Sequence, residues 1–310
     1  MDATQSILPQ PWPELLRRHI QAHPITAIGL GLAMVLVLLL LLQSLVLLWI
    51  GDVGPGVRYG LIGGLAGFAT TSLGALPAFV LRRIPQRVED AMLGFAAGMM
   101  LAASAFSLLL PGLDAAHELT GSSGLSAAVV VLGMALGVAL MLGLDEFTPH
   151  EHEKTGPCGP GYERCDRIWL FVFAIALHNI PEGMAIGVSF SQGDMKVGLP
   201  LTTAIALQDI PEGLAVALAL IAAGFRPGLA VLIAIGSGVL EPFGALLGIG
   251  VASGMPLAYP IGLGLAAGAM LFVVSHEVIP ETHRNGHQTF ATMGLMLGFA
   301  LMMTLDTALG

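Results

Sequence analysis

Two similar stretches of the sequence place polar side chains among apolar ones. Residues 176–190 read ALHNIPEGMAIGVSF, and residues 206–220 read ALQDIPEGLAVALAL. Side chains three and four positions apart share one face of a helix. Each stretch, if helical, therefore gathers one polar cluster: His178, Asn179 and Glu182 in the first, and Gln208, Asp209 and Glu212 in the second. A proline at the centre of each stretch frees a backbone carbonyl one turn back and predicts a kink beside the cluster.

The acidic residues of these clusters need a positive partner. With Glu241, which precedes a proline in a third apolar stretch, they make four carboxylates, and no lysine or arginine lies in the same stretches. At the centre of a bilayer each would cost about 2.5–3.5 kcal/mol. Imidazole with carboxylates suits zinc and neighbouring transition metals, whereas oxygen-only sites suit magnesium or calcium. The pattern predicts a divalent transition-metal site.

Two ions could share this site if Glu182 and Glu212 face each other and bridge them. One ion would then take His178 and Gln208, and the other would take Asn179, Asp209 and Glu241. The alternative is that these polar side chains only hold helices together by hydrogen bonds. Glu241 could also serve only the kinked backbone before its proline.

The composition indicates a membrane protein. The chain has 310 residues, of which 55% are hydrophobic and 11% charged, and it contains 41 glycines. These values are typical of a polytopic membrane protein rather than a soluble domain. The formal charge of -9 excludes the basic surface that a nucleic-acid partner would need. The two cysteines lie in one polar loop and do not make a disulfide framework.

Apolar stretches of about 20 residues predict membrane-spanning helices in an all-α fold. The sequence contains nine such stretches, at 26–50, 56–81, 91–112, 124–147, 168–192, 198–223, 228–252, 257–280 and 288–308. The first is too long for a cleaved signal peptide and is expected to be a retained helix. We therefore expect a cytoplasmic segment 1–25, an extra helix 26–50 and a main membrane domain 56–310 containing a loop at 148–167.

Basic residues predict the orientation. If the N-terminus is cytoplasmic, ten lysines and arginines lie in inner loops and only Arg58 and Lys196 lie outside. The C-terminus then faces outward and the loop at 148–167 faces the cytoplasm. In a bacterium, this membrane would be the inner membrane.

A repeated sequence indicates an inverted architecture. Residues 94–101 read GFAAGMML and residues 264–271 read GLAAGAML. The two stretches are five spans apart and must cross in opposite directions. This predicts two three-helix units inverted around the paired central helices, a 3+2+3 arrangement typical of secondary transporters. Generic packing of small residues between membrane helices is the alternative.

HNIPEG at 178–183 and QDIPEG at 208–213, in successive spans, resemble the signature helices of the ZIP (Zrt-, Irt-like) metal transporters. The resemblance covers 56–310 and implies eight core helices around a binuclear site, zinc uptake into the cytoplasm, often with cadmium as a further substrate, and a homodimer. The metal would be substrate, so no cofactor is expected. By motif, one site resembles His178, Glu182, Gln208 and Glu212, and the second resembles Asn179, Asp209 and Glu241 with both glutamates shared.

The same resemblance suggests roles outside the central clusters. Met100 would line the pathway, or simply pack in the core, and Asp114 would collect cations at the outer mouth, or simply end a helix. An exit relay would comprise His276, Glu277, Glu281, His283 and His287. A solvated helix end explains these five equally simply. The loop at 148–167 could capture metal weakly through His150 and His152, aided by its cysteines, or be an ordinary connection.

Several other functions compete with transport. An intramembrane metalloprotease needs H-E-x-x-H, but the nearest candidate, at 276–280, ends in proline. The absence of a Walker A pattern argues against direct use of ATP. A metal-selective channel and a metal-sensing receptor remain alternatives. The inverted repeat favours alternating access. The resemblance to the ZIP family implies that the spans 56–81, 168–192, 198–223 and 228–252 would move as one metal-carrying bundle against the others. The Gly/Ala-rich faces of 94–101 and 264–271 would then permit sliding.

Overall fold

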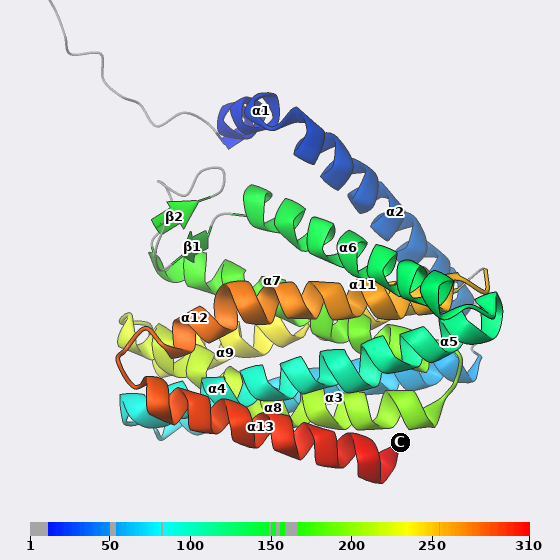
Figure 1. Ribbon diagram of the computed structural model, residues 1–310. Helices are drawn as coiled ribbons and strands as arrows, with labels where there is room; N and C mark the ends of the chain where they lie inside the picture. The colour runs from blue at the N-terminus through cyan, green and yellow to red at the C-terminus, as the bar shows by residue number, and fades with distance from the viewer. Residues whose placement is uncertain are drawn as a thin grey trace, which may run out of the picture.

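The computed structural model describes residues 12–49, 54–81, 83–148, 150–152, 156–158, 167–253 and 255–310. Helices make up nearly all of this part of the chain (Figure 1). In chain order the elements are α1 (Trp12–Ala22), α2 (Pro24–Trp49), α3 (Pro55–Ala75), the 3-10 turn η1 (Leu76–Phe79), α4 (Gln86–Ala102), the π-helix η2 (Ala103–Leu109), α5 (Leu110–Thr120), α6 (Ser123–Phe147), β1 (His150–His152), β2 (Gly156–Cys158), α7 (Arg167–Phe190), α8 (Met195–Ala222), α9 (Pro227–Gly238), α10 (Leu240–Val251), α11 (Ala258–Val273), the π-helix η4 (Val274–Val278), α12 (Ile279–Thr282) and α13 (Gln288–Leu309).

The predicted membrane bundle is confirmed. By length and composition, seven helices of the described chain could span a membrane, or eight if the bent pair α1 and α2 forms one span. The helix α7, with 24 residues, lies outside that count. Large apolar side chains such as Leu132 and Leu297 are exposed on the outer helices, as contact with lipid requires. The third span is longer than the predicted 91–112, because α4, η2 and α5 continue one another over Gln86–Thr120.

Four pairs of parallel helices form the core of the fold. The pairs are α4 with α13, α6 with α11, α7 with α10, and α3 with α8. In the first pair, Gly94 lies against the backbone of Ala291, and Gly98 lies against that of Leu295. A methyl group at either glycine would overlap a backbone carbonyl oxygen, so glycine is what permits this close approach.

The same contacts recur in the second pair and establish the inverted repeat. Gly264 and Gly268 of α11 lie against the α6 backbone at Val130 and Met134. The chain turns back between α12 and α13, so α13 runs opposite to α11 (Figure 1). Because α4 is parallel to α13, α4 also runs opposite to α11. Both α4 and α11 also pass into a π-helix at nearly the same point after their small-residue motif. The matching motifs are therefore related structural positions rather than generic packing.

The positions of these glycines differ from the expectation that their faces permit sliding between the two moving groups of helices. The faces of residues 94–101 and 264–271 that carry glycine pack inside the pairs α4–α13 and α6–α11, where close backbone contact holds the partners together. The remaining interface, between the group α3, α7, α8, α10 and the group α4, α6, α11, α13, is filled by aliphatic and methionine side chains. A flexible apolar surface of this kind suits relative movement better than interlocked backbones.

Candidate metal centre

The central polar residues lie on three neighbouring helices. α7 carries HNIPEG and α8 carries QDIPEG, and each is one continuous helix across its proline, Pro181 or Pro211. The third helix, α10, begins at Leu240 after α9 ends at Gly238, so Glu241 lies in its first turn. In close register, α10 packs on α7: Gly183 lies against the backbone of Glu241. This register brings Glu241 beside the IPEG turn.

The structure buries most of the predicted ligands and brings three of the carboxylates together. His178, Asn179, Glu182, Gln208, Asp209 and Glu241 are buried, and Glu212 is partly buried. Carboxylate oxygens of Glu182, Asp209 and Glu212 lie within 4.8 Å of one another. Gln208 Nε2 donates a hydrogen bond to Glu182 Oε1 at 2.6 Å and so joins the two IPEG helices directly. This arrangement can surround a cation with carboxylate oxygens, and His178 lies one helical turn before Glu182.

A fourth helix, α3, completes the site, and the sequence analysis missed its contribution. Thr71 Oγ1 donates to Glu241 Oε1 at 2.7 Å, and Thr70 Oγ1 donates to Asp209 Oδ2 at 3.3 Å. Gly67, one turn earlier, leaves the space that the Glu241 carboxylate fills. The residues TT within an apolar helix carry no recognisable metal signature. The only indication in the sequence is that these two hydroxyl side chains lie at the same depth in the membrane as the carboxylates.

Several atoms of the cluster are left without a hydrogen bond. Of the described residues, none donates to Glu182 Oε2, Gln208 Oε1 or Glu241 Oε2, although each is buried. Buried polar atoms normally have partners, and several buried carboxylates without a counter-charge are strongly unfavourable. The three apolar stretches that carry these residues, 168–192, 198–223 and 228–252, contain no lysine or arginine. A divalent cation is the partner that all these oxygens could share.

Comparison with known proteins agrees with this chemistry. Residues 148–306 match the family model of the ZIP zinc transporters. The chain is 65% identical over 290 residues to the zinc transporter ZIPB of Bordetella bronchiseptica, with 94% of each chain covered. It is 41% identical to the zinc transporter GufA of Myxococcus xanthus, over 81% of this chain and 99% of that protein. The human zinc transporter ZIP11 is 30% identical over 81% of this chain and 97% of its own length.

The chain belongs to the ZIP zinc transporter family. Its relatives are transporters, so membership places it apart from the metalloproteases and other enzymes. It also agrees with the multi-pass helical bundle described above.

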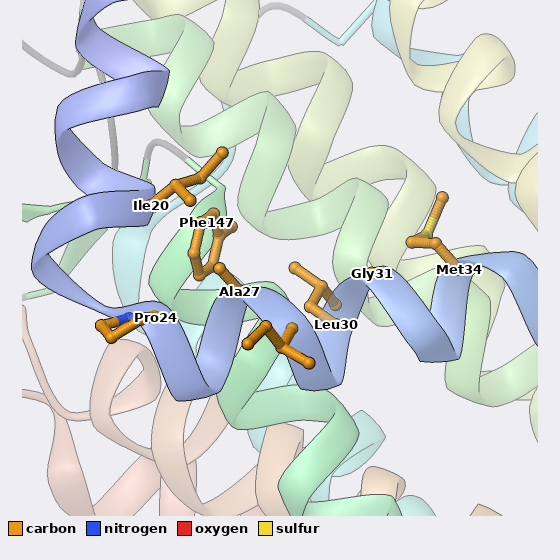
Figure 2. A pocket seen from close by; sticks show the side chains of 8 residues that line it. Ile20, Pro24, Ala27, Leu30, Gly31, Met34 and Phe147 are labelled. Carbon is orange, nitrogen blue, oxygen red and sulfur yellow. The ribbon is translucent and has the colours of Figure 1, made fainter.

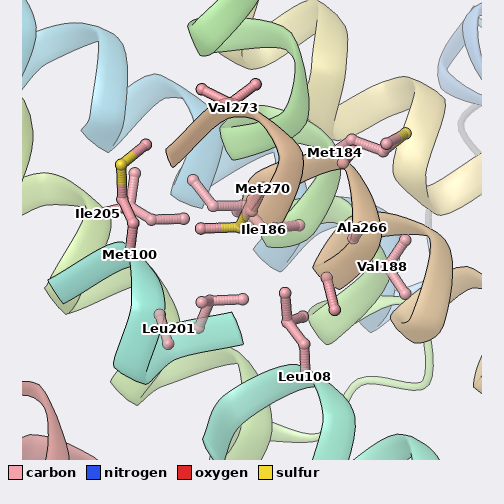
Figure 3. Close-up of a cluster of buried hydrophobic side chains, with 14 of the residues drawn as sticks. Met100, Leu108, Met184, Ile186, Val188, Leu201, Ile205, Ala266, Met270 and Val273 are labelled. Carbon is pink, nitrogen blue, oxygen red and sulfur yellow. The ribbon is translucent and has the colours of Figure 1, made fainter. Parts of the chain in front are cut away.

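In this ZIP protein, Met100 is a buried residue of the apolar core. It lies between the two helix groups, in a cluster with Ile186, Ile205 and Met270 (Figure 3). Its side chain is 1% exposed. This position shows the core-packing role, and the role in lining the pathway stays a prediction.

Asp114 and the five residues of the expected exit relay lie at different places. Asp114 is exposed on α5. His276 is exposed on η4, where its Nε2 lies 4.0 Å from Asp145 Oδ2 and its ring stacks on Phe272; Glu277 follows it there. Glu281 forms an ion pair with Arg284 at 3.2 Å. Residues of the expected exit relay thus contact different partners: His276 contacts Asp145 and Phe272, whereas Glu281 contacts Arg284.

The other two histidines of that relay make local contacts. His283 Nδ1 lies 2.8 Å from Thr282 Oγ1, and His287 Nδ1 lies 2.9 Å from Asp90 Oδ2. Asp90, at the start of α4, is fully buried and also accepts a hydrogen bond from Asn285 Nδ2 at 3.0 Å. The sequence analysis missed Asp90. Its contacts indicate that His287 anchors the turn between α12 and α13 to α4.

The predicted capture loop contains a short β-hairpin. β1 and β2 pair antiparallel, and the backbone register sets His150 opposite Cys158 and His152 opposite Gly156. The proposed capture of metal by these two histidines stays a prediction. Cys165 lies outside the described residues.

Proposed function

We propose that this protein carries zinc across the membrane and binds it between α7, α8, α10 and α3. The observation that carries the proposal is the buried cluster of Glu182, Asp209 and Glu212, whose oxygens lie within 4.8 Å of one another, with no basic residue in the apolar stretches 168–192 and 198–223 that carry them. Histidine beside these carboxylates favours zinc over magnesium or calcium. The names of the relatives, all zinc transporters, support the same substrate.

The ligand set divides most simply between two ions. His178 and Gln208 would hold the first ion, while Asn179, Asp209 and Glu241 would hold the second; both would share Glu182 and Glu212. The hydrogen bonds support this division, because Gln208 contacts Glu182 whereas the threonines of α3 hold the oxygens of Asp209 and Glu241. Cadmium, which takes the same ligand types, would be a further substrate.

Uptake would run toward the cytoplasm. By the distribution of basic residues, the N-terminus, the β-hairpin, His276 and Glu277 would face the cytoplasm, and Asp114 would lie at the outer mouth. We assign the protein to the bacterial inner membrane and expect a homodimer, on the family resemblance. In this orientation Asp114 would attract incoming cations, and His276 with Glu277 would receive them at the exit.

The mechanism would be alternating access by an elevator movement. The group α3, α7, α8 and α10 holds every proposed ligand of the two ions. It meets the other group through apolar side chains such as Ile186, Leu201 and Met270 (Figure 3). A rigid group that carries its metal past an apolar surface would need no rearrangement of the ligands.

Zinc uptake into proteoliposomes loaded with a zinc-sensitive dye tests the function. The full chain should give a signal that saturates with external zinc, whereas Glu182→Ala and Glu212→Ala should abolish it. The matched control is Glu118→Ala, which removes an exposed carboxylate from α5. Wild-type flux in both glutamate variants would refute the site, and zinc binding without flux in the unaltered protein would identify a receptor instead.

A disulfide between the two helix groups tests the mechanism. A Cβ atom built at Gly262 of α11 lies 3.3 Å from Val188 Cγ1 of α7, where a cysteine sulfur would sit. We expect oxidation of the pair Val188→Cys and Gly262→Cys to stop uptake, and reduction to restore it. The control pair, Gly112→Cys and Val130→Cys, joins α5 and α6 of one group, where the corresponding distance is 3.6 Å.

Both pairs belong in a background in which Cys158 and Cys165 are serine, so that only the designed bond can form. If the disulfide between the groups forms fully and zinc still flows, no elevator movement is required. That result would favour a channel.

A further inference from the structure

A second cluster of metal-ligating side chains lies far from the central site, where the N-terminal helices meet the end of α6. His23 Nε2 lies 3.3 Å from Glu146 Oε1, and His19 Nε2 lies 3.5 Å from the same oxygen. The ligand atoms of the three residues all lie within 4.8 Å of one another. Each side chain is partly exposed, so an ion could reach the cluster from water.

The local backbone fixes the two histidines side by side. His23 is the bend residue between α1 and α2, whose axes differ by 113°. Pro24 follows it, and proline disfavours helical conformation in the preceding residue. The hydrogen bond from His23 N to His19 O, at 2.9 Å, nevertheless keeps the i, i+4 spacing across the bend. The two rings are therefore stacked, with centroids 4.8 Å apart.

The end of α6 completes the cluster. Glu146 is the penultimate residue of that helix, and Phe147 packs edge-on against the His19 ring at 4.9 Å. This aromatic contact orients one imidazole toward the carboxylate. The three ligands thus come from two segments that are separated by more than one hundred residues in the chain.

We propose that His19, His23 and Glu146 form a binding site for a divalent transition metal such as zinc. Ligands on a tetrahedral zinc ion with bonds of about 2.0–2.1 Å lie about 3.3–3.4 Å apart. Both nitrogen-to-oxygen distances are close to this value. Two imidazoles and one carboxylate are a common zinc ligand set, and water would take the fourth position.

Metal binding at this cluster would displace a proton from it. Both histidine nitrogens face one carboxylate oxygen, and His19 Nε2 also lies 2.9 Å from the backbone oxygen of Glu146. Without metal, this nitrogen must carry a proton to bond either oxygen. A metal replaces such protons, because neutral imidazole binds through its lone pair. Binding should therefore release protons.

The ion would dock the N-terminal helices onto the bundle. Beside the cluster, the bend and Phe147 enclose an apolar groove of about 420 Å³, lined by side chains that include Ile20, Leu30 and Met34 (Figure 2). α1 and α2 are therefore incompletely packed against α6 at this point. A metal that ties both histidines to Glu146 supplies the fixed contact that the apolar packing lacks.

Cobalt titration of the purified full chain tests the proposal. The background carries Glu182→Ala and Glu212→Ala, which removes the central site. We expect the double variant His19→Ala, His23→Ala to bind one cobalt ion fewer per chain than this background and to lose a tetrahedral d–d absorption band. Glu146→Gln should weaken the same band. His117→Ala, which removes an exposed histidine from α5, is the matched control and should change neither quantity.

An unchanged cobalt count and band after loss of both histidines would overturn the proposal. A second measurement separates metal binding from an ordinary clasp: protection of α1 against hydrogen exchange should rise when cobalt is added and should be lost with EDTA. Protection that is the same with and without cobalt would mean that the three residues form only a structural contact, and this too would overturn the proposal.

Discussion

The substitution Gly67→Ala should weaken the binding of one of the two proposed ions without disturbing the helix α3 that carries Gly67. A Cβ atom built at Gly67 lies 3.1 Å from Glu241 Cδ and closer still to its Oε2, whereas ordinary contacts begin at 3.4 Å. Glu241 must therefore shift by at least about 0.3 Å, more than the 0.2 Å or so that a coordination bond tolerates. The carboxylate cannot simply rotate away, because Thr71 holds its other oxygen.

The expected result is a loss of at least about tenfold in affinity for the second ion, or about 1.4 kcal/mol. Isothermal titration with zinc should show that only the step assigned to Asn179, Asp209 and Glu241 weakens. Alanine is itself favourable in a helix, by about 1 kcal/mol relative to glycine, so the thermal stability should not fall. The control Gly236→Ala adds a methyl group to open space in α9 and should leave both steps unchanged. Two unaltered binding steps in the Gly67 variant would refute the reasoning.

Three further substitutions test other parts of the structure. Thr71→Val removes the donor to Glu241 Oε1 and should weaken zinc binding severalfold by titration, with little change in fold by circular dichroism. Gly98→Ala places a methyl group against the α13 backbone and should cost about 1–3 kcal/mol, measured as a lower midpoint of thermal unfolding. Asp90→Ala leaves His287 without its carboxylate partner, so hydrogen exchange should become faster in the turn before α13 while zinc binding at the central site is unchanged.

The sequence predicted the central residues because their chemistry is conspicuous against an apolar background. His178 and Glu212 stand in spans that have no other reason to contain them. The supporting residues could not be predicted in the same way. Gly67 acts by lacking a side chain, and Thr71 acts through one hydrogen bond whose acceptor is 170 positions away. Such roles depend on which helices pack together, and only the fold supplies that information.

The fold was predictable to a similar degree. Apolar length gave the spans, and the repeat at 94–101 and 264–271 gave the inversion, since both features survive in local sequence. The partner of each glycine could not be read from these motifs. Small residues suit both a tight helix pair and a sliding surface, and the choice depends on which neighbour each glycine faces.

The inverted repeat also explains how the ligands are shared between the two proposed ion positions. Residues related by the repeat are His178 with Gln208, Asn179 with Asp209, and Glu182 with Glu212, each pair 30 positions apart. Each proposed ion is thus held by one related pair, as expected for ions on the axis of inversion.

Only the bridging pair is identical, so the symmetry fixes the positions of the ligands while the sequence sets their chemistry. His178 makes the first position selective for transition metals. The second position has only oxygen ligands from side chains, and its outer carboxylate is unmatched: the repeat places Thr71 where the other half has Glu241, and these two residues bond to each other at 2.7 Å. A glutamate at both places would have set two carboxylates in contact. With a threonine at one of them, the related residue stabilises the ligand instead of repelling it.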